Sequence, residues 1–221
     1  MATVLALETS ADACSVALSL DGDVLERHEI LPRSHTRHIL PMVDALLRNA
    51  GIRLENLDAI AFGRGPGSFT GLRVCASVVQ GLAYAAALPC IPVSSLQALA
   101  MTAVDAGLSA GYRDILSCVD ARMNELYCGR FSLRDGIPVL EGEEFLAAPE
   151  AVAWDSFVAC RVGSGWSFAE MMQYSGAIEG LDLLPKASAV ARLGELMFKA
   201  GQVVAPAEAL PVYLRDDVAW R

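Results

Sequence analysis

The sequence feature that most constrains the fold is a pattern that occurs twice, about half the chain apart. An apolar strand ends in a carboxylate, which is Glu8 in the first copy and Asp120 in the second. In both copies a second strand, an Asp-Gly turn at residues 21–22 or 135–136, and a third strand follow. Asp-Gly between strands is a strong hairpin signal, and a long-period repeat indicates duplication. The sequence therefore predicts two copies of one strand-led unit, and two unrelated β-meanders are the alternative.

Helices alternate with short strands after the first meander. Apolar residues recur at three- and four-residue steps from His35 until Gly51, and a second helix is expected from Phe69 to about Ala87. Strands at 57–62 and 90–93 complete the alternation, which is typical of a largely parallel sheet. The second half offers only a short helix near Phe168 and another at 187–200. We expect an α/β fold with one domain at 1–108 and a reduced second domain at 109–221.

Composition and charge narrow the class of protein. Lys and Arg number 17 against 26 Asp and Glu, a formal charge of −9, which argues against a protein that holds a nucleic-acid backbone unaided. The most apolar window, 72–91, is interrupted by Arg73, Gln80 and Pro89, so no membrane span is expected and the protein should be cytoplasmic. The six cysteines form no C-x-x-C pair, so we expect them to be reduced and buried in the core.

A metal site is not predicted. His35 and His38 lie one helical turn apart, but H-E-x-x-H ligands are missing from the sequence around them, and Arg33 and Arg37 beside them would oppose a dication. No cofactor is expected either.

The glycine-rich segment 63–73 is the most informative motif. It follows a strand and opens a helix, where backbone N–H groups and the helix dipole favour an anion. Its spacing matches neither the dinucleotide fingerprint nor the Walker loop. Ser68 is placed to cap the helix, so a turn without a ligand is the alternative. The candidate anion or nucleotide site consists of Glu8, Asp12, Gly65, Gly67, Ser68 and Thr70.

The helix after this segment is apolar on two sides. One stripe should face the sheet, and a second stripe of small residues lets another helix approach closely. The first helix either packs against this stripe of small residues within the chain, or both helices face a partner protein. The candidate interface consists of Leu40, Met42, Val43, Leu46, Leu47, Val74, Val78 and Gly81.

Five segments in the same order resemble the bacterial TsaB (YeaZ) family. They are residues 5–10 with 13–18 (LALETS and ACSVAL), 35–43, the glycine-rich run 63–73, 120–123 (DARM), and 211–215 (PVYLR) with 218–220 (VAW). The resemblance covers nearly the whole chain.

The resemblance implies an actin-like (ASKHA, ribonuclease H-like) fold and a role in tRNA threonylcarbamoyladenosine (t6A) biosynthesis. In that pathway the threonylcarbamoyl group passes from threonylcarbamoyl-AMP to the adenosine next to the anticodon. The family implies a non-catalytic scaffold that is required with the catalytic paralogue TsaD and the ATPase TsaE. An exposed apolar patch is most simply covered in a two-fold homodimer, so we expect a homodimer when the subunit is alone. Neither half of the chain is net basic, so we expect tRNA contact mainly through TsaD.

Two departures concern catalysis. The catalytic relatives carry an H-x-x-x-H metal motif where this sequence has Ser95 and Leu99, and leucine cannot ligate a metal. The first strand usually ends in Asp, and here it ends in Glu8. We therefore expect a subunit that is not itself an enzyme. The alternative is a stand-alone actin-like ATPase or phosphotransferase, with Glu8, Asp12 and the 65–71 loop around a magnesium nucleotide.

Overall fold

The computed structural model describes residues 2–154 and 158–215 in two compact units. The first unit comprises Met1–Ala98 and Pro185–Pro211, and the second comprises Leu99–Leu184 and Val212–Arg221. Residues 218–220, which contribute to the family resemblance, lie outside the described residues. Among the helices of the described ranges, none has the length and apolar character needed to cross a membrane.

The first unit is built on a five-stranded sheet in the order β3-β2-β1-β4-β5. β1 pairs in parallel with β4 and antiparallel with β2, so the expected meander lies beside a parallel half. Every residue of β1 and β4 is buried, as expected for central strands covered on both faces. The strands are β1 (Val4–Glu8), β2 (Ala13–Leu20), β3 (Asp23–Ile30), β4 (Ala59–Gly63) and β5 (Cys90–Val93).

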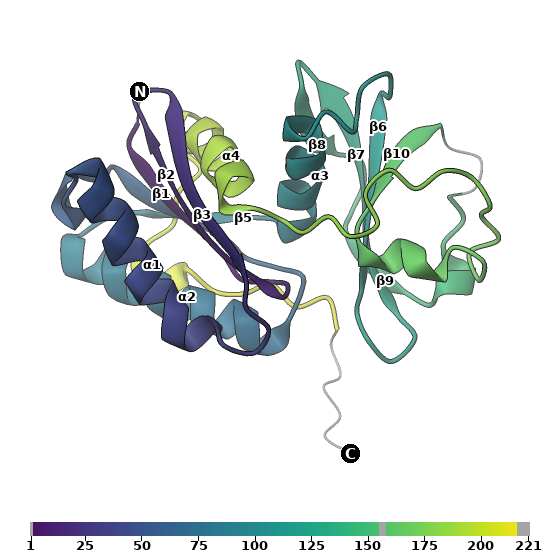
Figure 1. Ribbon diagram of the computed structural model, residues 1–221, viewed down its shortest axis with the longest axis horizontal. Helices are drawn as coiled ribbons and strands as arrows, with labels where there is room; N and C mark the ends of the chain where they lie inside the picture. Colours follow the sequence, from purple (N-terminus) through teal and green to yellow (C-terminus); the bar gives the residue numbers. More distant parts are fainter. Residues whose placement is uncertain (1, 155–157, 216–221) are drawn as a thin grey trace. The chain divides into compact units, whose positions relative to one another are not determined.

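Helices cover both faces of this sheet. α1 (His35–Ala50) packs against β2 and α2 (Phe69–Ala86) against β4 on one face. α4 (Ala187–Lys199) covers the other face, where it contacts β1, β2 and β4 (Figure 1). The buried apolar side chains of the strands and of these helices form the core of the unit.

The second unit repeats the plan of the first. β6, β7 and β8 form an antiparallel meander, and β10 pairs in parallel with β6, as β4 does with β1. Within its described residues this sheet has no counterpart of β5 beyond β10. The predicted α/β fold with two lobes on one plan, the second reduced, is confirmed. The strands are β6 (Asp114–Asp120), β7 (Leu126–Arg134), β8 (Ile137–Leu140), β9 (Phe145–Ala147), which pairs with β7, and β10 (Ala159–Val162).

The division between the units differs from the single boundary expected near residue 108. The first unit ends at Ala98 and regains the chain at Pro185, because α4 packs on the first sheet. The amphipathic pattern of α4 shows that it must cover a sheet but does not say which one.

Some elements were not predicted as they occur. Helix α3 (Ser95–Asp105) was missed because nearly all of its residues up to Ala103 are buried, so it shows no polar face. The single strand expected at 138–145 is two, β8 and β9, and the helix near Phe168 is a 3-10 turn. The 3-10 turns are η1 (Leu54–Asn56), η2 (Pro149–Ala151), η3 (Ser164–Phe168) and η4 (Pro206–Glu208).

The start of α4 is capped by strands far away in the sequence. Its N-cap residue, Lys186, makes no side-chain cap. Instead Ala187 N donates to Ser15 Oγ at 2.9 Å, and Ser188 N donates to Glu26 Oε1 at 2.9 Å. Ser15 Oγ in turn donates to Glu26 Oε1 at 3.2 Å. Orphan N–H groups of the helix are thus satisfied by β2 and β3, which fixes where α4 meets the sheet.

Removing this cap should destabilise the first unit. We expect Ser15→Ala to lower the free energy of unfolding by about 1–2 kcal/mol, because a buried helix N–H loses its acceptor. Urea denaturation measures the effect. The control is Ser77→Ala on the exposed side of α2, which should change the same quantity by less than about 0.5 kcal/mol. Equal effects of the two substitutions would contradict the tertiary cap.

Candidate functional site

The glycine-rich segment joins the end of β4 to the start of α2, as predicted, and it folds against the residues after β1. Ser68 N donates to Ser10 O at 2.7 Å, and Gly65 N donates to Ser95 Oγ at 3.2 Å. Arg64 N donates to Val93 O at 2.8 Å. Donors that a phosphate-binding loop would direct at an anion therefore serve the chain itself.

Ser68 caps α2, as the sequence predicted. Its Oγ accepts a hydrogen bond from Gly71 N at 3.3 Å. Of the other candidates for the anion loop, Asp12 and Thr70 are exposed, and Gly67 is half-buried. Anion binding stays a prediction, and the contacts of Gly65 and Ser68 favour a structural turn.

Glu8 is a buried carboxylate at the centre of these contacts. Its side chain is only 1% exposed. Oε1 accepts from Ser10 N at 2.5 Å, and Oε2 accepts from Ser95 Oγ at 3.0 Å. Burial raises the pKa of the carboxyl above its ordinary value, although the donors at Ser10 and Ser95 oppose that rise. Glu8 therefore joins β1, the glycine-rich loop and the start of α3.

Three glycines of the segment are required by space. A Cβ on Gly63 would overlap Glu8 Oε2, and one on Gly67 would overlap Ser10. A Cβ on Gly71 would overlap the carbonyl oxygen of Thr9, whose Oγ1 donates to Gly71 O at 2.8 Å. Thr9 and Ser10 were not among the predicted site residues, because their role is visible only once β1 and the loop are adjacent.

The predicted interface residues do not share one surface. Met42, Val43 and Leu46 are buried in the core of the first unit, so their assignment to an outer face was wrong. The apolar stripe of α1 that contains them faces the unit's own core, and α1 packs on β2. Periodicity identifies such a stripe but not what covers it.

The remaining candidates lie outside or at the border of the core. Leu40 is 48% exposed and Gly81 is exposed. Three more are half-buried against the core, namely Leu47, Val74 and Val78. Tyr84, one turn after Gly81 on α2, is 83% exposed and was not among the predicted residues. We call the exposed residues Ser77, Gly81, Tyr84 and Ala85 the outer face of α2.

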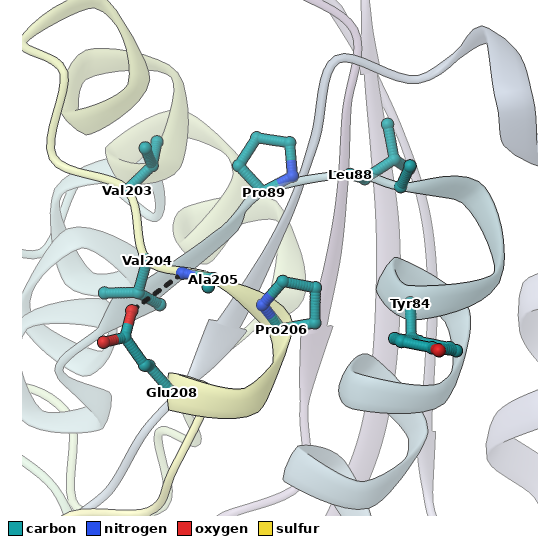
Figure 2. Close-up of a pocket in the computed structure, with 9 residues that line it drawn as sticks. Tyr84, Leu88, Pro89, Val203, Val204, Ala205, Pro206 and Glu208 are labelled. Carbon is teal, nitrogen blue, oxygen red and sulfur yellow. Dashed lines mark hydrogen bonds between the residues drawn. The ribbon is translucent and has the colours of Figure 1, made fainter.

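Tyr84 also lines a hollow of about 560 Å³ in the first unit. Figure 2 shows Tyr84 on α2 and Pro206 on the segment that follows α4, with Leu88 and Pro89 between α2 and β5. Glu208, the carboxylate in the lining, accepts a hydrogen bond from Ala205 N at 3.0 Å. The hollow offers an apolar contact surface rather than a set of reactive groups.

His38 and Asp120 have structural partners, whereas the buried Nε2 of His35 has no hydrogen-bond partner among the described residues. His35 is buried, and a ring nitrogen of His38 lies 2.9 Å from Ser34 O. Asp120 accepts a hydrogen bond from Arg122 N at 2.7 Å and pairs with the Arg122 guanidinium at 3.1 Å.

Two of the segments that carry the family resemblance meet in the second unit. Arg215 pairs with Glu125 at 2.6 Å and donates to the carbonyl oxygen of Ala121 at 3.1 Å, both in the turn between β6 and β7. Arg122, Met123 and Asn124 in this turn have positive φ angles. Arg215 thus holds a turn whose backbone is otherwise unfavourable.

Comparison with known proteins decides the family. The chain is 38% identical to the tRNA threonylcarbamoyladenosine biosynthesis protein TsaB of Haemophilus influenzae, over 99% of this chain and 96% of the relative. It is 40% identical to the Escherichia coli protein of the same name, with the same coverage. The chain belongs to the TsaB family.

The solved structures and the family model agree with TsaB membership. YeaZ from Pseudomonas aeruginosa matches with a TM-score of 0.88 and 42% identity, over 97% of this chain and 100% of that one. The family model described as TsaD: tRNA N6-adenosine threonylcarbamoyltransferase matches residues 28–153. This TsaB-family chain therefore has the actin-like fold that the resemblance implied.

The buried carboxylate of the TsaB-family chain should make its stability depend on pH. Because the pKa of Glu8 is raised in the folded state, its contribution is fully present below the unfolded pKa, about 4.3, and is lost as pH rises through the folded pKa. Glu8→Gln keeps an acceptor for Ser10 N and does not ionise. We expect the wild type to lose stability relative to Glu8→Gln between about pH 4 and about pH 8.

Urea unfolding of both proteins at the two pH values measures this difference. Glu55→Gln serves as the control, because Glu55 is exposed and pairs with Arg53 at the surface. A gap between wild type and Glu8→Gln that is the same at both pH values would contradict the raised pKa.

Two glycines of α2 should respond in opposite ways to the same substitution. We expect Gly71→Ala to lower the free energy of unfolding by about 3 kcal/mol, because its Cβ would overlap the Thr9 backbone. A Cβ on Gly81 would meet nothing within 4 Å, so Gly81→Ala should stabilise the helix by about 0.5–1 kcal/mol. Thermal or urea unfolding compares them, and a tolerated Gly71→Ala would refute the close packing of the loop.

Proposed function

We propose that this chain is a non-catalytic cytoplasmic subunit for t6A biosynthesis, required with TsaD and TsaE for transfer of the threonylcarbamoyl group. The observation that carries the proposal is the environment of Ser95. At the position of a metal-ligating imidazole in the catalytic relatives, its hydroxyl donates to the buried Glu8 and accepts from Gly65 N. Ser95 therefore holds the glycine-rich loop in place.

The second position of the relatives' metal motif, Leu99, also supports a non-catalytic subunit. Leu99 is fully buried. It packs so closely on Gly163 that a Cβ added to this glycine would lie 2.8 Å from Leu99 Cδ2. A buried aliphatic side chain supplies no metal ligand and leaves no space for one. The family similarity to TsaD therefore concerns the fold, and we assign the transferase chemistry to TsaD.

The outer face of α2, together with Leu40 of α1, is our proposed docking surface for TsaD. Small residues such as Gly81 and Ala85 let a partner helix come close, and Tyr84 supplies a large amphipathic contact. When the chain is alone, the same surface would cover itself in a two-fold homodimer. Met42, Val43 and Leu46 are excluded from this surface because they are buried.

Charge supports the division of labour for tRNA. The chain carries a formal charge of −9, so phosphate contacts that dominate RNA affinity would be unfavourable over most of its surface. We therefore assign the main tRNA contacts to TsaD.

Reconstitution tests the proposal. Modification of tRNA is assayed with TsaD, TsaE and threonylcarbamoyl-AMP, with and without this chain. Omission should abolish modification, and Ser95→Ala, if folded, should retain it. Tight binding and turnover of MgATP by the isolated chain would favour the stand-alone ATPase instead.

One substitution tests the docking surface without disturbing the fold. We expect Gly81→Glu to lower both TsaD binding and tRNA modification about tenfold or more, because a charge would be buried in the contact. The matched control is Leu196→Glu on α4, which is 43% exposed on the other face of the sheet. Unfolding curves establish that both variants fold. If Gly81→Glu binds TsaD as well as Leu196→Glu does, the outer face of α2 is not the interface.

A further inference from the structure

Two cysteines of the second unit face each other across the sheet. Cys118 of β6 and Cys128 of β7 are register partners in the antiparallel ladder. Their sulfur atoms are 3.3 Å apart, and both side chains are fully buried. Neither thiol takes part in the contacts of Glu8 or in the proposed docking surface.

The hydrogen-bond pattern of the ladder gives the geometry of this pair. Leu133 N donates to Arg113 O at 2.8 Å near one end, and Ala121 N donates to Glu125 O at 2.9 Å at the other. Hydrogen-bonded pairs alternate with non-hydrogen-bonded ones along an antiparallel ladder. Counting from either end makes Cys118–Cys128 a non-hydrogen-bonded pair. Cα atoms of such pairs are about 4.5 Å apart, inside the range of roughly 4.4–6.8 Å that disulfides require.

The surroundings limit access to the pair. Cys118 packs against the backbone of Gly165, and both cysteines share a core cluster with Trp166. The hydrogen bond with Cys128 and burial raise the pKa of Cys118 well above its ordinary value. Only a small oxidant reaches these thiols in the folded chain, and the reaction is slow compared with that of an exposed thiolate.

We propose that Cys118 and Cys128 are a redox-sensitive pair that closes into a disulfide when the folded chain meets hydrogen peroxide. One thiol loses its proton, and its thiolate attacks a peroxide oxygen to become a sulfenic acid. The hydroxide that leaves takes up that proton as the first water. The second thiol attacks that sulfur, loses its proton and displaces a second water. The two thiols together lose two electrons, and one peroxide accepts them and becomes two waters. A dithiol reductant reverses the step by thiol–disulfide exchange.

The disulfide would tie β6 to β7 close to their connecting turn. The turn that it encloses contains Arg122, Met123 and Asn124 at positive φ and is held by Arg215. The cross-link removes open states of the hairpin, so amide hydrogen exchange in β6 and β7 should slow. Disulfides in reducing compartments are mostly transient and redox-sensing, which fits such a device.

Peptide mapping of the full chain tests the proposal. The native protein is treated with hydrogen peroxide, alkylated and digested. We expect free thiols to fall from six to four and a peptide linking Cys118 to Cys128 to appear. Dithiothreitol should restore both thiols. Tryptophan fluorescence gives a second readout, because a disulfide in the same cluster as Trp154 and Trp166 should quench it reversibly.

Variants and a denatured sample sharpen the result. Cys118→Ala and Cys128→Ala should each abolish the linkage, whereas Cys160→Ala should not, since Cys160 lies opposite Ile115. Urea-denatured chain should yield mixed pairings. If folded wild-type chain keeps both thiols free, oxidises them separately to sulfinic acids, or links either to another cysteine, the proposal is overturned, and this holds even if the alanine variants do not fold.

Discussion

The first unit depends on the seating of one carboxylate at the end of its central strand. Glu8 is buried and accepts hydrogen bonds from Ser10 N and Ser95 Oγ. Burying a carboxylate is costly, and donors at Thr9, Ser10 and Ser95 reduce the cost. The glycine at position 63 gives it room, since any Cβ there would overlap Glu8 Oε2. The glycine-rich loop, the end of β1 and the start of α3 are consequently one packed assembly.

The same carboxylate bears on how the loop is held. Its hydrogen bonds with Ser10 N and Ser95 Oγ hold the residues after β1 and the start of α3 in place around the loop. The Gly65 and Ser68 amides already donate to Ser95 and Ser10. A motif that looks like an anion cradle in sequence thus also packs the loop against the rest of the unit, and anion binding stays a prediction. The raised pKa of Glu8 reflects its burial and does not by itself indicate catalysis.

The sequence predicted most of the strands and the duplication, because hairpin turns and buried runs leave local signals. It failed where the outcome depends on what packs against an element. Helix α3 shows no polar face because it is buried almost all round, and α4 returns to the first sheet for reasons visible only in Ser15 and Glu26. The candidate site divides in the same way. Glycines 63 to 71 and the Ser68 cap were found, but Thr9, Ser10 and Tyr84 were not.

The two sides of α2 differ in what they contribute to stability. Leu72, Cys75 and Val79 are buried against the core and supply the apolar area that holds the helix on the sheet. Ser77, Gly81 and Ala85 expose little apolar area, so leaving them in water costs the free chain little. Their value appears only when another backbone comes close, because small side chains permit helix axes to approach near the lower end of the usual 8–10 Å range. A surface of this kind discriminates by shape rather than by hydrophobic area, and Tyr84 at its end adds the one large contact. The outer face of α2 therefore has the shape that the helix docking we propose requires.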